Sequence, residues 1–102
     1  MNQTTVQSLF RKFAAPLAGY AATSPARKEL AEMLARNLWT ALIAGPEMEA
    51  ETWNILKTTG KLDADSLQAI QELYCEQMKP VVTEEELVDL RQRYQFKRKG
   101  QA

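Results

Sequence analysis

Apolar residues recur at helical spacing in five stretches of the chain, and no stretch alternates as a β-strand does. The stretches cover about residues 5–22, 25–44, 46–58, 63–78 and 83–96. In each of them apolar side chains stand three or four residues apart, which places them on one side of a helix. The pattern predicts an all-α fold: a compact bundle of four to five short helices at mixed packing angles, because the connections between them are brief.

The second stretch has the broadest apolar surface and is expected to form the centre of the core. Its main apolar positions are Leu30, Met33, Leu34, Leu38, Ala41 and Leu42. Trp39 and Ile43 lie beside these positions and extend the apolar surface beyond one face. Such width predicts contacts with neighbouring helices on more than one side.

Residues with known effects on helix ends mark the boundaries of the first three helices. Ser24 followed by Pro25 is a typical helix start, because serine caps free amide groups and proline suits the first helical position. Gly45 and Gly60 are expected to end the second and third helices. Pro16, inside the first stretch, predicts a kink or a division into two short helices.

The last two helices carry signals of the same kind. Asp63 or Asp65 is expected to cap the fourth helix. That helix is predicted to end before Pro80, because a residue that precedes proline disfavours helical backbone angles. Thr83 and Glu86 have the spacing of a capping box, in which each side chain bonds to the backbone amide of the other residue.

Composition and charge fit one ordinary globular domain. The chain has 102 residues, of which 45% are hydrophobic and 25% charged. We expect residues 1–96 to form a single helical domain and residues 97–102 a flexible basic C-terminal tail. Thirteen basic and thirteen acidic residues give a formal net charge of zero. A chain without net charge is not attracted as a whole to polyanions, and copies of it repel one another only weakly.

The sequence also bears on location. Its first residues lack the basic start and continuous apolar run of a secretory signal. No apolar stretch approaches the roughly 18 residues that a membrane span needs. We therefore expect a cytoplasmic protein that does not bind membranes.

The residue types that most catalytic and metal sites use are scarce. Histidine is absent and Cys75 is the single cysteine, so the commonest general base and a one-chain zinc site are excluded. Asp63 and Asp65 begin the spacing of a calcium-binding EF-hand loop, but no glycine or closing glutamate follows. Acidic clusters at 47–51 and 84–89 suit helix starts, where the helix dipole favours negative charge.

From this chemistry we expect no enzymatic activity, no metal and no cofactor. A small enzyme or ligand carrier is the least supported alternative. Cys75 is expected to be buried as a small apolar residue, since its place late in a helix does not favour a reactive thiolate.

Aromatic residues give the main positive indication of function. The chain has two tryptophans, three tyrosines and three phenylalanines, which one small core does not readily cover. Exposed aromatic and apolar side chains commonly anchor protein interfaces. The candidate interaction residues are Trp39, Ile43, Trp53 and Tyr20. We therefore predict a protein–protein interaction or assembly module that forms a homodimer or binds another protein.

The C-terminal segment suggests an alternative, a regulator associated with nucleic acid. Residues 91–102 contain no acid and five bases, Arg91, Arg93, Lys97, Arg98 and Lys99. Such residues contact phosphates while neighbouring aromatic rings stack on bases. The same cations also complement the C-terminal end of a helix. A helix-turn-helix over residues 55–70 is disfavoured, because acids stand where its reading helix would meet phosphates.

Overall fold

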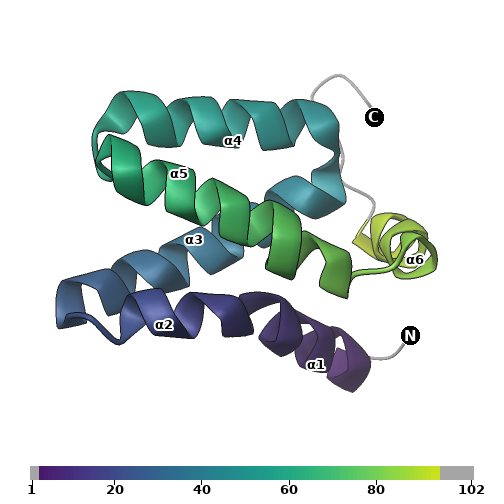
Figure 1. The fold of residues 1–102 in the computed structure, drawn as a ribbon. Helices are drawn as coiled ribbons and strands as arrows, with labels where there is room; N and C mark the ends of the chain where they lie inside the picture. Colours follow the sequence, from purple (N-terminus) through teal and green to yellow (C-terminus); the bar gives the residue numbers. More distant parts are fainter. Residues whose placement is uncertain (1–2, 95–102) are drawn as a thin grey trace.

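The computed structural model describes residues 3–94, and within them the side chains of residues 6–93. The α-helices are α1 (Gln3–Ala14), α2 (Ala18–Ala21), α3 (Pro25–Ala44), α4 (Pro46–Thr59), α5 (Ala64–Leu73) and α6 (Glu84–Tyr94) (Figure 1). Three short turns complete the path: 3-10 turns η1 (Ala15–Leu17) and η3 (Lys79–Val81), and a π-helical turn η2 (Tyr74–Met78). The described residues contain no β-strand, so the predicted all-α fold with five helical segments is confirmed.

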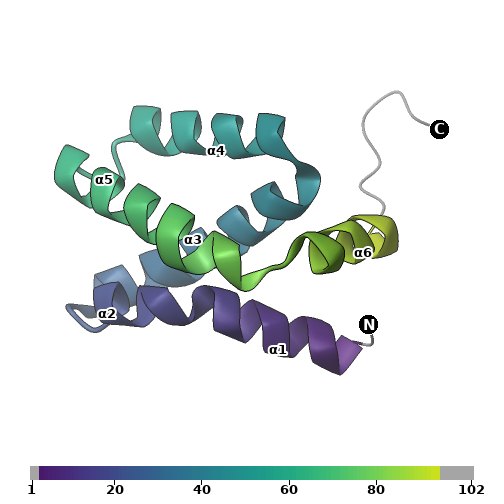
Figure 2. The ribbon, with the colours of Figure 1, turned by 45° about the vertical axis from the view of Figure 1, so that its right-hand side comes forward.

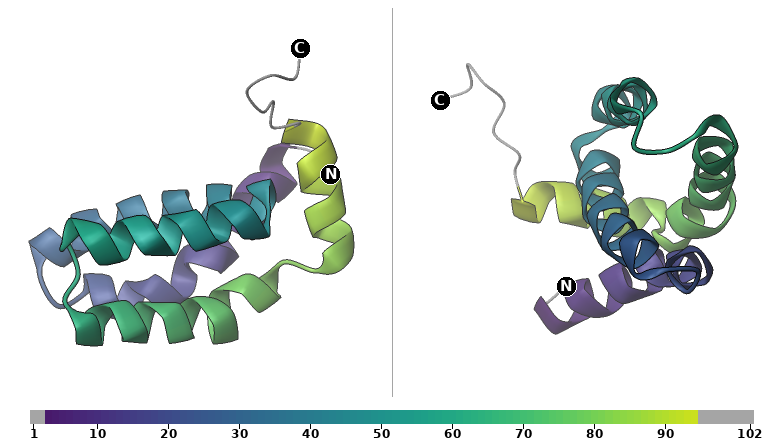
Figure 3. Two further views of the ribbon diagram at one scale, coloured as in Figure 1. Left: turned by 90° about the horizontal axis from the view of Figure 1, so that it is seen from above. Right: turned by 90° about the vertical axis from the view of Figure 1, so that its left-hand side faces the viewer.

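The helices enclose the core as a short bundle. α4 and α5 run antiparallel to each other, while α1 and α2 lie along the opposite side of the molecule (Figures 1 and 2). α3 contacts both α2 and α4, and η2 contacts α1, so these segments surround a common interior. The end-on view in Figure 3 shows this arrangement, with α6 placed across one end of the bundle. The mixed packing angles follow from the sharp connections on either side of α3.

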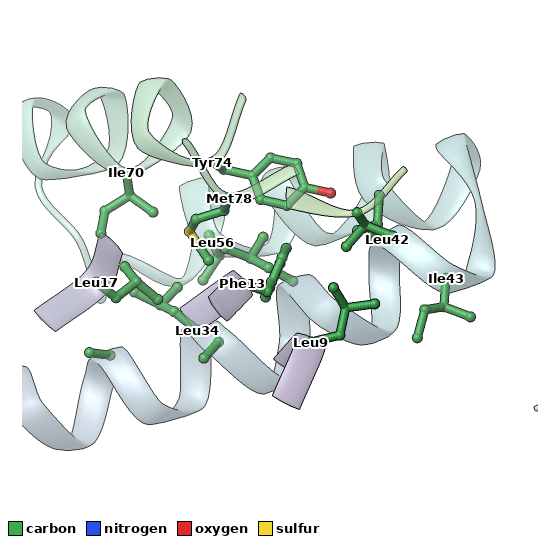
Figure 4. Packing of buried hydrophobic residues seen from close by; sticks show 14 of the residues in the cluster. Leu9, Phe13, Leu17, Leu34, Leu42, Ile43, Leu56, Ile70, Tyr74 and Met78 are labelled. Atoms are coloured by element: carbon green, nitrogen blue, oxygen red, sulfur yellow. The ribbon is translucent and has the colours of Figure 1, made fainter. Parts of the chain in front are cut away.

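α3 supplies the largest part of the core, as the breadth of its apolar surface predicts. Its buried residues are Ala31, Leu34, Ala35, Leu38, Ala41, Leu42 and Ile43. Phe13 of α1, Leu56 of α4, Ile70 of α5 and Tyr74 of η2 converge on them (Figure 4). Burying one large apolar side chain stabilises a fold by about 1.5–3 kcal/mol. The helices are therefore held together mainly through their shared contact with α3.

The predicted helix boundaries around α3 are confirmed. Ser24 accepts a hydrogen bond from the Arg27 amide at 3.1 Å, and Pro25 is the first residue of α3. Gly45 and Gly60 have φ angles of 125° and 71°, in a region that residues with side chains rarely adopt. The chain therefore turns sharply at both ends of α4.

The predicted helix caps in the rest of the chain, and the predicted division of the first helix, are also found. The Asp63 carboxylate accepts a hydrogen bond of 2.7 Å from the Ser66 amide, which lowers the pKa of Asp63 below its usual value. Thr83 and Glu86 form the capping box through bonds of 3.1 and 3.0 Å. Pro16 lies in η1, which divides the first segment into α1 and α2. Proline lacks the amide hydrogen that a continuous helix would use there.

The fourth segment ends at Met78, before Pro80 as predicted, but it is not α-helical throughout. The α-helical part stops at Leu73, the π-helical turn η2 continues to Met78, and Pro80 lies in the 3-10 turn η3 that follows. In η2 the Lys79 amide donates to the Tyr74 carbonyl across a widened turn. This turn buries both Tyr74 and Met78, and the gain from their burial accounts for the departure from regular helix.

The same turn corrects the expectation for Cys75, whose side chain is exposed and not buried. Cys75 directly follows Tyr74, and neighbouring residues on a helical turn point in different directions. Because Tyr74 and Met78 occupy the inward side of η2, Cys75 faces solvent.

Arg91 joins α6 to the end of α3. Its Nε donates to the Ile43 carbonyl at 2.9 Å, and its Nη2 donates to the Leu42 carbonyl at 3.2 Å. Carbonyls in the last turn of a helix lack helical partners. For Leu42 the partner would be the nitrogen of Pro46, which carries no hydrogen. The guanidinium therefore caps α3 and also meets the negative end of its dipole.

Replacement of Arg91 tests this cap. We expect Arg91→Ala to lower the free energy of unfolding by about 1–3 kcal/mol, since two carbonyls lose a charged donor. Arg93→Ala is the matched control, because Arg93 makes an exposed ion pair of 3.2 Å with Asp89 on its own helix, and its loss should cost about 0–0.5 kcal/mol. Urea unfolding of both variants provides the comparison. Equal losses would show that Arg91 does not act as a cap.

Candidate interaction surfaces

Two of the four predicted interaction residues belong largely to the interior. Ile43 is 2% exposed and lies in the core, so it offers no surface to a partner. Trp39 is partly buried, and its ring centroid lies 5.4 Å from that of Phe10 and 5.1 Å from that of Phe13, both in edge-on geometry. These ring contacts attach α1 to α3.

The other two predicted residues also have partners within the chain. Trp53 is partly buried, with its ring centroid 5.6 Å from that of Tyr74. Tyr20 is partly buried and lies under the Arg27 guanidinium, 5.0 Å from the ring centroid, in a cation–π contact. The structure therefore does not bring the four predicted residues together as one exposed patch.

The predicted phosphate-binding residues fall into two groups. Arg91 binds the end of α3, and Arg93 pairs with Asp89 on its own helix. Lys97, Arg98 and Lys99 lie outside the described residues, as does the predicted tail of residues 97–102. Arg91 thus has an internal role that the sequence pattern did not reveal.

A groove that sequence reasoning missed runs between the α1–α2 segment and α3. Its volume is about 390 Å³. The lining residues are mainly small or apolar: Phe10, Ala14, Leu17, Ala18, Ala21, Ala31 and Ala35, with Lys28, Glu32 and Arg36 on α3. We call it the alanine groove. Short side chains on both helices leave this space open. The recurrence of alanines at helical spacing on both segments is the sequence pattern that could have predicted the groove.

A second apolar surface lies on α4. Met48 and Ile55 are 42% and 49% exposed, although both residues are large and apolar. Together with Thr52 they stand at positions i, i+4 and i+7 and line a shallow depression of about 300 Å³ beside Asn37 and Thr40 of α3. We call Met48, Glu51, Thr52 and Ile55 the α4 stripe. Because Leu56 is the buried residue of α4, the stripe lies to one side of the core-facing surface.

Charge is distributed unevenly between the two halves of the fold. Residues 3–44, which form α1 to α3, contain five basic and two acidic residues. Residues 45–94, which form α4 to α6, contain five basic and eleven acidic residues. The alanine groove thus belongs to a part with net charge +3, and the α4 stripe to a part with net charge −6. The balanced total hides this polarity.

One polar cluster joins α4 to the π-helical turn. The Tyr74 hydroxyl donates to Glu49 Oε2 at 2.6 Å, and Lys79 Nζ lies 3.3 Å from the same oxygen. Burial, together with the hydrogen bond to Glu49, raises the pKa of Tyr74 far above its ordinary value. The hydroxyl therefore stays protonated and acts as a donor, which makes this cluster a link between elements and a poor source of a general base.

Other kinds of site find little support in the described residues. Among residues 3–94, no three acidic, cysteine or histidine side chains are grouped to hold a metal ion. None of the helices in this part of the chain is both long and apolar enough to cross a membrane. Comparison with protein-family models, curated proteins and solved structures finds no match.

The raised pKa of Tyr74 predicts a loss of stability at alkaline pH. Above about pH 10 a tyrosine in the unfolded chain ionises, whereas folded Tyr74 keeps its proton, so the free energy of unfolding falls as the pH rises. We expect Tyr74→Phe to be less stable at neutral pH, by about 1–3 kcal/mol, and to lose less stability above pH 10. Urea unfolding across this pH range measures both effects. Tyr20→Phe is the control, and an identical alkaline loss in the wild type and Tyr74→Phe would contradict the assignment.

Proposed function

We propose that this protein is a small non-enzymatic interaction module that assembles with copies of itself. The observation that carries the proposal is the pair of uncovered apolar surfaces, the alanine groove and the α4 stripe. Most large apolar side chains among residues 6–93 are buried or partly buried, whereas these two surfaces are open to solvent. Apolar surface of this kind commonly serves as a contact between proteins.

The position of the exposed residues supports the proposal more than their number does. Single exposed apolar side chains are ordinary on protein surfaces. Met48 and Ile55, however, lie on the same side of α4 and border a depression. Val88 of α6 is 51% exposed but lines neither of the two surfaces, and it provides a useful comparison.

Charge supports a second copy as the partner. The whole chain is neutral, so copies of it do not repel one another strongly. The basic α1–α3 part and the acidic α4–α6 part attract each other when they belong to different molecules. The polar chemistry supports a non-enzymatic role, because Tyr74 is kept protonated and its partner Glu49 is paired with Lys79.

The concentration dependence of the molecular mass tests this proposal. Sedimentation velocity and light scattering from micromolar to millimolar protein should show an average mass that rises above the 11.6 kDa of one chain. Added salt should lower the average mass, because about 1 M salt reduces the screening length to about 3 Å. A strict monomer at every concentration would contradict self-association.

A further inference from the structure

We infer that self-association joins unlike surfaces, with the α4 stripe of one copy seated in the alanine groove of another. This inference rests on the proposed self-association and specifies the two surfaces that form the contact. Helices commonly bind in grooves through residues at positions i, i+3, i+4 and i+7. Met48, Glu51, Thr52 and Ile55 have this spacing.

The dimensions of the two surfaces agree. The stripe spans eight residues from Met48 to Ile55, and the seven steps between them cover about 10 Å along a helix. The α3 wall of the groove spans nine residues from Lys28 to Arg36, and the eight steps between them cover about 12 Å. Alanines at positions 14, 18, 21, 31 and 35 project little from their helices. The groove therefore lets a helix approach closely and bury the two large side chains of the stripe.

The charges of the two surfaces are complementary. Glu51 lies on the stripe between Met48 and Ile55, near the acidic first turn of α4. Lys28 and Arg36 line the groove on α3, where Glu32 is the one acidic lining residue. Docking brings Glu51 toward a surface with a net positive lining. Electrostatic complementarity of this kind favours the correct partner and the correct orientation.

The same charges disfavour contacts between like surfaces. Groove against groove would bring two positive linings together, and stripe against stripe would bring Glu51 near its own copy. Such juxtaposition of like charges costs free energy. The groove and the stripe are also separate surfaces, since they share no lining residue. Each copy therefore has one alanine groove that can bind the stripe of a neighbour, and one α4 stripe that can bind in the groove of another neighbour.

Two complementary variants test the arrangement. Lys28→Glu with Arg36→Glu reverses the charge of the groove and leaves the stripe intact. Met48→Ser with Ile55→Ser removes the apolar anchors and leaves the groove intact. All four residues are exposed, and circular dichroism and urea unfolding are used to check that each variant is folded. We expect each variant alone to lose self-association by at least about tenfold in affinity.

The mixture of the two variants is the decisive measurement. One variant retains a working stripe and the other a working groove, so equimolar mixing should form a one-to-one complex with the mass of two chains. Val88→Ser is the matched apolar control and should associate as the wild type does. Sedimentation velocity reports all of these species.

The outcomes separate this inference from the proposed function. A monomeric wild type would contradict self-association itself. A wild type that associates, with either double variant retaining its affinity, would overturn the assignment of the surfaces while self-association stands. Two variants that stay monomeric after mixing would also overturn it, because the intact stripe of one variant and the intact groove of the other would then have failed to bind each other.

A single substitution in the groove gives an independent check by strengthening the contact. Glu32→Gln removes the one acidic lining residue. We expect it to tighten self-association by about twofold to fivefold, since a repulsion with the acidic stripe is removed. Weaker or unchanged association would contradict the predicted position of the stripe in the groove.

Discussion

The structure depends on the burial of α3 by helices on several sides. Its leucines and alanines contact α2, α4 and α6, and the large rings of Phe13 and Tyr74 fill the space opposite them. An edge-on contact at 6.1 Å between the centroids of these two rings joins α1 to η2. No other helix of the described fold buries as many residues, so the positions of the remaining helices follow from their contacts with this shared interior.

The same constraint explains why two apolar surfaces remain open. Where α2 and α3 approach, alanines provide close backbone packing but too little volume to fill the outer space, and the alanine groove results. α4 contributes one buried residue, Leu56, and one partly buried ring, Trp53. Met48 and Ile55 are turned to the side of that contact and stay exposed. In the proposed assembly, a second copy covers what the single chain cannot.

Polar contacts hold the peripheral helices in place without adding reactive groups. Glu49 receives the Tyr74 hydroxyl and the Lys79 ammonium, which attaches α4 to the turn after α5. Arg91 binds the final carbonyls of α3 and attaches α6 across the end of the bundle. Both contacts satisfy groups that would otherwise be costly to bury. Glu49, Tyr74 and Arg91 thus have structural roles, although their residue types alone would suggest acid–base chemistry or phosphate binding.

The sequence by itself determined the helices, because periodicity and caps such as Ser24, Gly45 and the Thr83–Glu86 box act over a few residues. It also identified α3 as the centre, since an unusually wide apolar surface needs several neighbours. Only the tertiary structure decided which apolar residues stay exposed. Ile43 and Ile55 look alike in the sequence, yet one is buried and the other is not, because exposure depends on how helices distant in the chain are placed against one another.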